Sequence, residues 1–344
     1  LTVCEGAAAA EAGPAIALPG VLAPGFFDIQ VNGAGGVLFN ADPSVATLAR
    51  MADAVRATGT AFFLPTLITD RPEVTAAAGA AVDAAIAAGV SGIAGIHLEG
   101  PFLNPARAGV HRAELMAPAT QPAVAALPLS RRGATLVTLA PERAEPGAIA
   151  DLAARGAVVF AGHTEADFAT MERAAAEGLA GATHVHNAMA PATSREPAAV
   201  GAALAVDGLY AGLIADGHHV HPAQVKLLLR AKPPDRAVLV TDAMPTLGAD
   251  IERFDLLGQE IRLGNGRLVT ADGRLAGAHL RLGMAVANAM AFAGIDLASA
   301  LATVTRNPAQ ALRLWPGLGR LEGSPGALTL YDPASGQAQV LTLG

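Results

Sequence analysis

The feature that most constrains this chain of 344 residues is a repeated alternation of short apolar runs with helical segments. Most runs are rich in Val, Ile, Leu or Phe, as strands buried in a parallel sheet are. They cover residues 25–32, 60–68, 92–99, 134–139, 157–163, 182–187, 209–215 and 236–242. Eight strands alternating with helices predict a (β/α)8 barrel, which needs about this chain length.

Helices are predicted between several of these strands. One begins at Asp42-Pro43, a capping residue followed by a proline at the first helical position, and ends near Gly59. The others cover residues 73–88, 148–155, 167–177 and 222–231, and most of them stop directly before a glycine.

Two regions depart from the alternation. Residues 254–276 are rich in glycine and alternate apolar with polar side chains, which predicts a β-hairpin insertion at about 250–276. Residues 326–344 have the pattern of short strands. Together with residues 1–22 they are expected to form a small β-rich domain beside a barrel of residues 23–325.

Composition excludes several partners. A net charge of −7 with no basic run argues against nucleic acid, whose phosphates require clustered positive charge. No run of about 20 strongly apolar residues occurs, so no membrane span is predicted. The single Cys4 excludes an internal disulfide and a cysteine zinc cluster, and no Lys/Arg-led signal segment opens the chain. These features predict a cytoplasmic enzyme.

Polar residues stand at or just beyond the ends of most predicted strands, where such barrels carry their catalytic groups. They are Gln30, Asn32, His97, Glu99, His163, His184, Asp216, His218, His219, His221 and Asp242. One isolated histidine or glutamate at a strand end is usually a surface or core polar group. Several compatible groups at neighbouring ends indicate a metal hydrolase, because imidazole and carboxylate together suit zinc and related ions.

Individual roles follow from this map. Glu99, His163 and His184 are the predicted metal ligands, and Asp242 is the predicted acid/base rather than a helix cap. His97 lies two residues before Glu99 and faces the same side of its strand, so it either orients that ligand or only packs. His186 and His218 are interpreted as structural or surface residues.

Six segments resemble one known family. They are PGFFD (24–28), HLEGPF (97–102), GHT (162–164), THVHNAM (183–189), DGHHV (216–220) and VTDA (240–243). In this order the chain resembles the N-acetylglucosamine-6-phosphate deacetylases of the amidohydrolase superfamily, over about residues 24–326. HLEGP and THxxNAM are specific to that family, whereas PGFxD marks only the superfamily.

The resemblance implies a barrel with a small β-sandwich built from both chain ends, a bound divalent metal and a homodimer. It assigns Glu99, His163 and His184 to the metal and Asp242 to catalysis. The positions it assigns to the phosphorylated sugar are His111, Asn187, Ala188, Arg195 and His219, and part of the phosphate site can come from the neighbouring subunit. The implied reaction converts N-acetylglucosamine 6-phosphate to glucosamine 6-phosphate and acetate, in amino-sugar catabolism or cell-wall recycling.

Three departures matter. Gln30 and Asn32 replace a His-x-His pair that helps many amidohydrolases hold a second metal, and amides are poor ligands, so one metal is predicted, as Zn, Fe, Mn or Co. Residues 276–280 replace a serine-containing run near the acyl group, which leaves the acyl pocket undefined. Only residues 1–24 precede Gly25, so the opening β-strands are expected to be shortened.

Other functions remain alternatives. Two histidines and a carboxylate also suit a non-haem iron oxygenase, although Asp242 on the last strand argues against it. A catalytically inactive binding barrel would not need all these groups. A deacylase for N-acetylgalactosamine 6-phosphate would use the same residues, whereas an N-acyl amino acid would leave Arg195 and His219 without a role.

Overall fold

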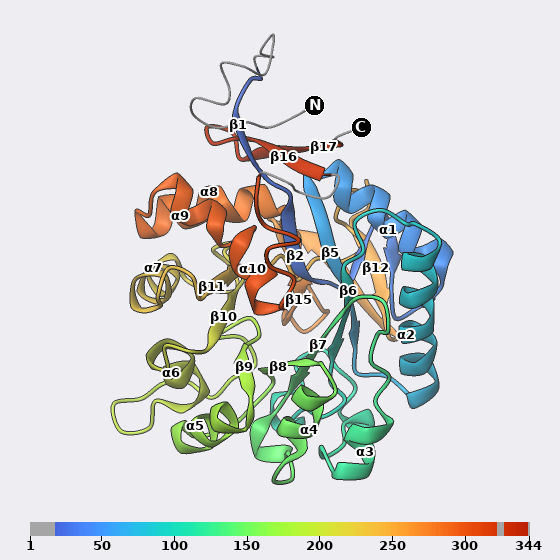
Figure 1. Cartoon of the computed structure of the whole chain (residues 1–344), viewed down its shortest axis with the longest axis vertical. Coiled ribbons are helices and arrows are strands. Elements are labelled where there is room, and N and C mark those ends of the chain that lie inside the picture. Colours follow the sequence, from blue (N-terminus) through green and yellow to red (C-terminus); the bar gives the residue numbers. More distant parts are fainter. Residues whose placement is uncertain (1–17, 322–326, 343–344) are drawn as a thin grey trace.

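A computed structural model describes residues 18–321 and 327–342 (Figure 1). Its central sheet has eight parallel strands in the order β11-β10-β9-β8-β7-β6-β5-β2. They are β2 (Phe26–Val31), β5 (Thr60–Ile68), β6 (Gly95–Glu99), β7 (Ala134–Leu139), β8 (Val158–Ala161), β9 (Leu179–Ala182), β10 (Tyr210–Leu213) and β11 (Ala237–Leu239). The order follows the sequence around the ring, and the predicted barrel is confirmed.

Helices surround the strands (Figure 1). They are α1 (Val45–Ala57), α2 (Pro72–Ala87), α3 (Gln121–Ala126), α4 (Ala148–Ala154), α5 (Phe168–Glu177), α6 (Ala198–Ala205), α7 (Pro222–Ala231), α8 (Leu282–Ala293), α9 (Leu297–Ala302) and α10 (Arg306–Ala311). The predicted start of α1 was wrong by two residues. Ser44 caps the helix by accepting the Thr47 N–H, and Asp42 instead accepts the hydroxyls of both residues.

The predicted position of the sixth strand was wrong. It was predicted over residues 182–187, whereas β9 ends at Ala182. His184 and His186 have φ angles of 33° and 81°, which lie in the left-handed region and cannot continue a pleated strand. The chain therefore turns here, and neither His184 nor His186 lies on a strand.

The barrel closes where β2 meets β11. Near the carboxyl ends, the Asn32 N–H donates to the Ala243 carbonyl oxygen at 2.8 Å. At the other end the connection between α9 and α10 links both strands: Phe27 N–H donates to Val304 O at 2.7 Å, and Leu239 N–H donates to Thr303 O at 3.1 Å.

Two antiparallel sheets flank the barrel. β1 (Val21–Pro24), β16 (Ala327–Asp332) and β17 (Gln337–Thr342) form one sheet from both ends of the described chain, as the fold prediction required. The predicted hairpin insertion is instead a four-stranded sheet of β12 (Arg253–Leu256), β13 (Gln259–Gly264), β14 (Arg267–Val269) and β15 (Leu275–Ala278). β3 (Gly33–Ala34) pairs with β4 (Val37–Leu38). The domain boundaries stay a prediction, and the expected shortening of the opening strands falls on residues 1–17, outside the described part.

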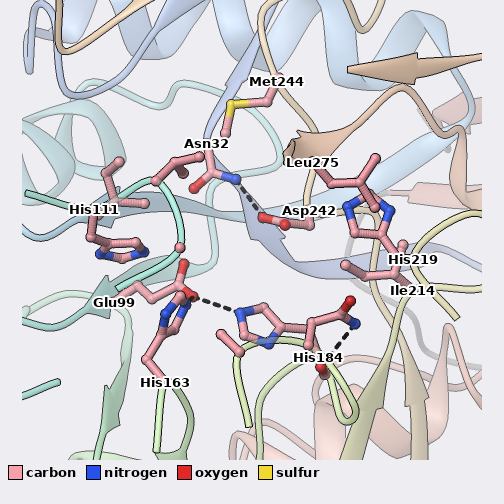
Figure 2. A pocket seen from close by; sticks show the side chains of 16 residues that line it. Asn32, Glu99, His111, His163, His184, Ile214, His219, Asp242, Met244 and Leu275 are labelled. Atoms are coloured by element: carbon pink, nitrogen blue, oxygen red, sulfur yellow. Dashed lines mark hydrogen bonds and ion pairs between the residues drawn. The ribbon is translucent and has the colours of Figure 1, made fainter. Parts of the chain in front are cut away.

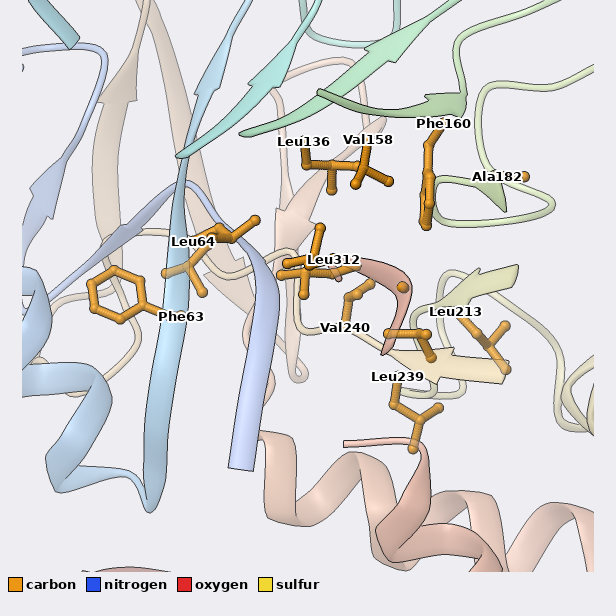
Figure 3. Packing of buried hydrophobic residues seen from close by; sticks show 14 of the residues in the cluster. Phe63, Leu64, Leu136, Val158, Phe160, Ala182, Leu213, Leu239, Val240 and Leu312 are labelled. Carbon is orange, nitrogen blue, oxygen red and sulfur yellow. The ribbon is translucent and has the colours of Figure 1, made fainter. Parts of the chain in front are cut away.

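Apolar side chains from the strands fill the space around the barrel wall. Figure 3 shows Leu136, Val158 and Phe160 on neighbouring strands, and it places Leu312, directly after α10, near Val240. All five are essentially excluded from solvent. Close packing of this kind holds the strand ends, and hence the polar residues beyond them, at fixed positions. Among the described residues, no helix is long and apolar enough to cross a bilayer.

A buried carboxylate also links the two closing strands. Asp28 of β2 is 1% exposed and accepts the Thr241 hydroxyl at 2.5 Å and the Gln30 N–H at 3.1 Å. Burial raises the pKa of Asp28 to about 7 against the hydrogen bonds that lower it. Asp28 therefore favours its protonated form across the acidic range.

This pKa predicts a pH-dependent stability. Because the folded chain keeps the Asp28 proton that the unfolded chain releases, the free energy of unfolding should fall as the pH rises from about 4 to about 7. Asp28→Asn should remove this component, which is on the order of a few kcal/mol. Urea unfolding of both proteins over this range measures the difference.

Asp42→Asn is the control, because hydrogen bonds from Thr47 and Ser44 lower the pKa of Asp42 and its contribution stays constant above its ordinary pKa. If the difference in the free energy of unfolding between the wild type and Asp28→Asn does not change with pH, the raised pKa of Asp28 is contradicted.

Candidate active site

A cavity of about 200 Å³ lies at the carboxyl ends of the barrel strands (Figure 2). Residues from seven barrel strands, or from the segments after them, contribute to its walls, together with the inserted sheet. The lining residues are Asn32, Ile68, Glu99, Gly109, Val110, His111, His163, His184, Asn187, Ala188, Ile214, His219, Asp242, Met244, Leu275 and Gly277. The cavity therefore contains most of the predicted site residues.

Glu99 is the centre of the polar wall. Its Oε1 atom lies 3.0 Å from His163 Nε2 and 2.9 Å from His184 Nε2, and all three side chains are buried. Ligand atoms on one tetrahedral metal ion lie roughly 3.4 Å apart, given bond lengths near 2.1 Å. Each of the two imidazole nitrogens is thus spaced from the Glu99 oxygen nearly as two ligands of a single ion are.

The tautomer of His163 supports this interpretation. Its Nδ1 lies 2.7 Å from the Arg107 carbonyl oxygen, which can only accept, so Nδ1 carries the hydrogen. In a neutral ring, Nε2 then points its lone pair at the Glu99 carboxylate. Two acceptors at 3.0 Å repel each other unless a cation lies between them, and a histidine ligand typically donates its other N–H to a backbone carbonyl in this way.

His111 offers a further nitrogen. The possible ligand atoms of Glu99, His111 and His163 all lie within 4.8 Å of one another, and the two imidazole rings are 4.4 Å apart. His111 Nδ1 lies 3.0 Å from the Thr69 hydroxyl, whose own hydrogen is donated to the Glu99 carbonyl oxygen at 3.3 Å. The Thr69 N–H also donates to His111 Nδ1 at 3.3 Å, so Thr69 occupies this nitrogen and leaves Nε2 as the ring nitrogen without a protein hydrogen-bond partner among the described residues.

Amide groups occupy the place of the missing His-x-His pair. Gln30 Nε2 donates to Glu99 Oε2 and to Asp242 Oδ1, both at 3.2 Å, and Asn32 Nδ2 donates to Asp242 Oδ1 at 2.6 Å. The amides thus present hydrogens, not lone pairs, to the two carboxylates. Such a site repels a second cation and holds Asp242 in position.

The pKa values of the two buried carboxylates, Glu99 and Asp242, shift in opposite directions. Burial opposes ionisation of Glu99, but the adjacent imidazoles of His163 and His184 outweigh it and hold the pKa of Glu99 well below the ordinary value. Burial, followed by the charge of Glu99, raises the pKa of Asp242 to about 6. Glu99 is therefore suited to remain a permanent anion, whereas Asp242 can exchange a proton near neutral pH.

Backbone conformation places these groups. His163, His184 and Asp242 each follow a barrel strand and have φ angles of 49°, 33° and 52°. Non-glycine residues adopt this left-handed conformation at a cost of roughly 1–3 kcal/mol each, and such strain concentrates at functional sites. The turns redirect all three side chains from the strand ends into the cavity (Figure 2).

The predicted sugar-binding residues separate into two groups. Four of them line the cavity, namely His111, Asn187, Ala188 and His219. The buried carboxylate of Asp216 lies 2.7 Å from His219 Nδ1. Arg195 is exposed on the loop between β9 and α6 and does not line the cavity.

Other histidines serve the structure. Both ring nitrogens of His97 meet threonine hydroxyls, Thr66 at 3.3 Å and Thr138 at 2.8 Å, which favours the packing interpretation left open above. His218 is exposed, His186 does not line the cavity, and His221 caps α7.

Sequence reasoning missed the apolar wall of the cavity and the hydroxyl that orients His111. The missed residues are Ile68, Thr69, Val110, Ile214, Met244 and Leu275. Ile68 ends a predicted strand, Thr69 follows it and Val110 precedes His111, but their apolar or hydroxyl side chains carry no chemical signal of their own.

Comparisons with known proteins agree with this geometry. The amidohydrolase family model matches residues 21–332. N-acetylgalactosamine-6-phosphate deacetylase from Shewanella sp. is 42% identical over 292 residues, covering 85% of this chain and 74% of the relative. N-acetylglucosamine-6-phosphate deacetylase from Haemophilus influenzae is 34% identical over 316 residues, covering 91% of this chain and 82% of that protein.

Solved structures show the same relationship. The Pasteurella multocida N-acetylglucosamine-6-phosphate deacetylase superposes with a TM-score of 0.86 at 31% identity, covering 94% of this chain and 87% of that one. A mutant of the Mycobacterium smegmatis enzyme, in complex with N-acetyl-D-glucosamine-6-phosphate, gives a TM-score of 0.85 at 31% identity and covers 96% and 89%. The chain therefore belongs to the amidohydrolase family and, within it, to the family of the N-acetylglucosamine-6-phosphate deacetylases.

Proposed function

We propose that this chain hydrolyses the acetamide of N-acetylglucosamine 6-phosphate, giving glucosamine 6-phosphate and acetate. The observation that carries the proposal is the convergence of Glu99 Oε1 with two imidazole nitrogens at 3.0 and 2.9 Å in the cavity that also holds Asp242. Similarity to deacetylases of N-acetylated amino-sugar phosphates supports this choice of substrate.

One divalent ion is part of the proposal, with Glu99, His163 and His184 as its ligands. Their donor set of one carboxylate and two imidazoles fits zinc best and also accepts Fe, Mn or Co. When bound, such an ion supplies a Lewis acid that lowers the pKa of water and polarises a carbonyl group. His111 lines the same cavity, and its ring is placed to donate a hydrogen bond or to add a fourth nitrogen, depending on its tautomer.

Asp242 is the proposed acid/base. It accepts a proton from the attacking water and returns it to the nitrogen of the sugar, because an unprotonated amine is a very poor leaving group. A pKa of about 6 suits both transfers near neutral pH. Gln30 and Asn32 hold the Asp242 carboxylate toward the cavity, so it does not need to reorient between the two steps.

The sugar phosphate extends toward His219, Asn187 and Ala188 in this proposal. The Asp216 carboxylate lies 2.7 Å from His219 Nδ1 and fixes the orientation of the His219 ring, which lines the cavity. Arg195 is exposed outside the cavity, which fits a phosphate site completed by a neighbouring subunit of a homodimer. A cytoplasmic location is proposed with it, in line with a chain that has one cysteine.

The galactosamine epimer is the second candidate substrate. The relative from Shewanella that is 42% identical to this chain is an N-acetylgalactosamine-6-phosphate deacetylase. The same ligands and the same Asp242 would serve either epimer, since the two sugars differ only at a hydroxyl distant from the amide.

Acetate release tests the proposed function. We expect hydrolysis of N-acetylglucosamine 6-phosphate by the metal-loaded protein, loss of activity after chelation and recovery when zinc is returned. The unphosphorylated sugar should react at least about tenfold more slowly in kcat/KM, because phosphate binding energy orients the amide. The galactosamine epimer, measured in parallel, ranks the two candidate substrates. Bound metal without release of acetate from any of these sugars would refute the substrate assignment and leave the metal site standing.

The amide pair predicts a gain of metal on substitution. Replacing Gln30 and Asn32 by histidine exchanges hydrogens for lone pairs beside Glu99 and Asp242, so the bound zinc should rise from about one to about two ions per chain. Elemental analysis after exhaustive dialysis measures the ratio. Gln30→Met/Asn32→Leu is the matched control without ligands and should stay near one. A folded double-histidine variant that also stays near one would show that the amides do not set the metal count.

A further inference from the structure

The cavity has an apolar wall that the proposed mechanism does not use. Ile68, Val110 and Met244 form this wall, and Ile68 and Met244 are each only 2% exposed. Both belong to a hydrophobic cluster that is separate from the main core, and Val110 packs against it. The other members of the cluster are Leu38, Leu256, Ile261, Leu268 and Ala276. The inserted four-stranded sheet therefore contributes the packing behind one side of the active site.

Met244 is held in place against β15. A Cβ atom added at Gly277 would lie 2.6 Å from Met244 Cγ and 2.7 Å from its Cε, so the glycine leaves room for this side chain. The Ala278 N–H donates to the Asp242 carbonyl oxygen at 2.9 Å. The same strand thus fixes Met244 and the catalytic aspartate relative to each other.

The direction of the substrate follows from the polar groups. Hydrolysis requires the carbonyl carbon close to Asp242 and Glu99, and the nitrogen carries the sugar toward His219. The acyl chain lies on the opposite side of the carbonyl carbon from the nitrogen. Figure 2 shows Met244 beside Asn32, with Asp242 between Met244 and His219 in this view. The acyl chain is therefore directed at the apolar wall.

We propose that Ile68, Val110 and Met244 form the acyl subsite, and that Met244 limits the chain to the two carbons of an acetyl group. This inference rests on the proposed function. A methyl group gains contact with such a wall, whereas each further methylene would have to displace a buried thioether that Gly277 and its neighbours hold. The inserted sheet then sets acyl-chain specificity, separately from the sugar side of the cavity.

Acyl-chain preference tests the subsite. We expect the wild type to cleave N-acetyl-, N-propionyl- and N-butyrylglucosamine 6-phosphate with steeply falling kcat/KM. Met244→Ala should raise the butyryl-to-acetyl ratio of kcat/KM by roughly 10- to 100-fold, the range that one or two methylenes in an apolar pocket can produce. Ile214→Ala is the matched control, because Ile214 lines the same cavity near His219 (Figure 2) and should leave the ratio within about twofold of wild type.

The outcomes separate the two claims. A wild type that cleaves none of these substrates contradicts the proposed function and the subsite with it. A wild type active on the acetyl compound, with an unchanged ratio in a folded Met244→Ala protein, contradicts only the subsite. Cooperative unfolding and metal content check that the variant folds. If it does not, Val110→Ala replaces it, with a rise in the same ratio expected and an unchanged ratio contradicting the proposal.

Discussion

The site depends on one buried carboxylate oxygen that faces two imidazole nitrogens at about 3 Å. Glu99 is excluded from water, and its charge must be balanced locally because a buried anion without a partner costs several kcal/mol. The Arg107 carbonyl fixes a hydrogen of His163 on the far side of the ring, which turns Nε2 toward the Glu99 carboxylate. The barrel closure, the left-handed turns and the orienting hydroxyls all serve to hold these three side chains together.

Asp242, the second carboxylate at this end of the barrel, differs from Glu99 in its hydrogen-bond partners and in the direction of its pKa shift. Asp242 is buried like Glu99, yet its partners are the amides of Gln30 and Asn32, and its pKa rises to about 6 instead of falling. One acid is thereby kept ionised for binding, and the other is poised to exchange a proton. Two amide side chains in place of imidazoles remove a possible ligand pair and add hydrogen-bond donors that orient the Asp242 carboxylate.

Strand periodicity and the polar residues beyond each strand were sufficient to predict the barrel and to bring Glu99, His163, His184 and Asp242 to one end of it. Those positions are predictable because parallel strands place all their carboxyl ends on one face. The predicted end of the sixth strand was wrong, because no local sequence signal indicates that the backbone of His184 adopts a left-handed conformation. The apolar wall could not be predicted, since Met244 joins it only through the packing of a distant strand around Gly277. The distance of Arg195 from the cavity likewise depends on the path of a loop.

The central claim, that Glu99 binds the metal and Asp242 moves the proton, is tested most directly by the bound metal content of two isosteric variants. Asp242→Asn should retain about one divalent ion per chain while turnover falls by roughly 100-fold or more. Glu99→Gln should lose most of the ion, because an amide replaces the only carboxylate among the ligands. Equal metal loss in both variants, or a Glu99→Gln protein that keeps its ion and its activity, would contradict this division of roles.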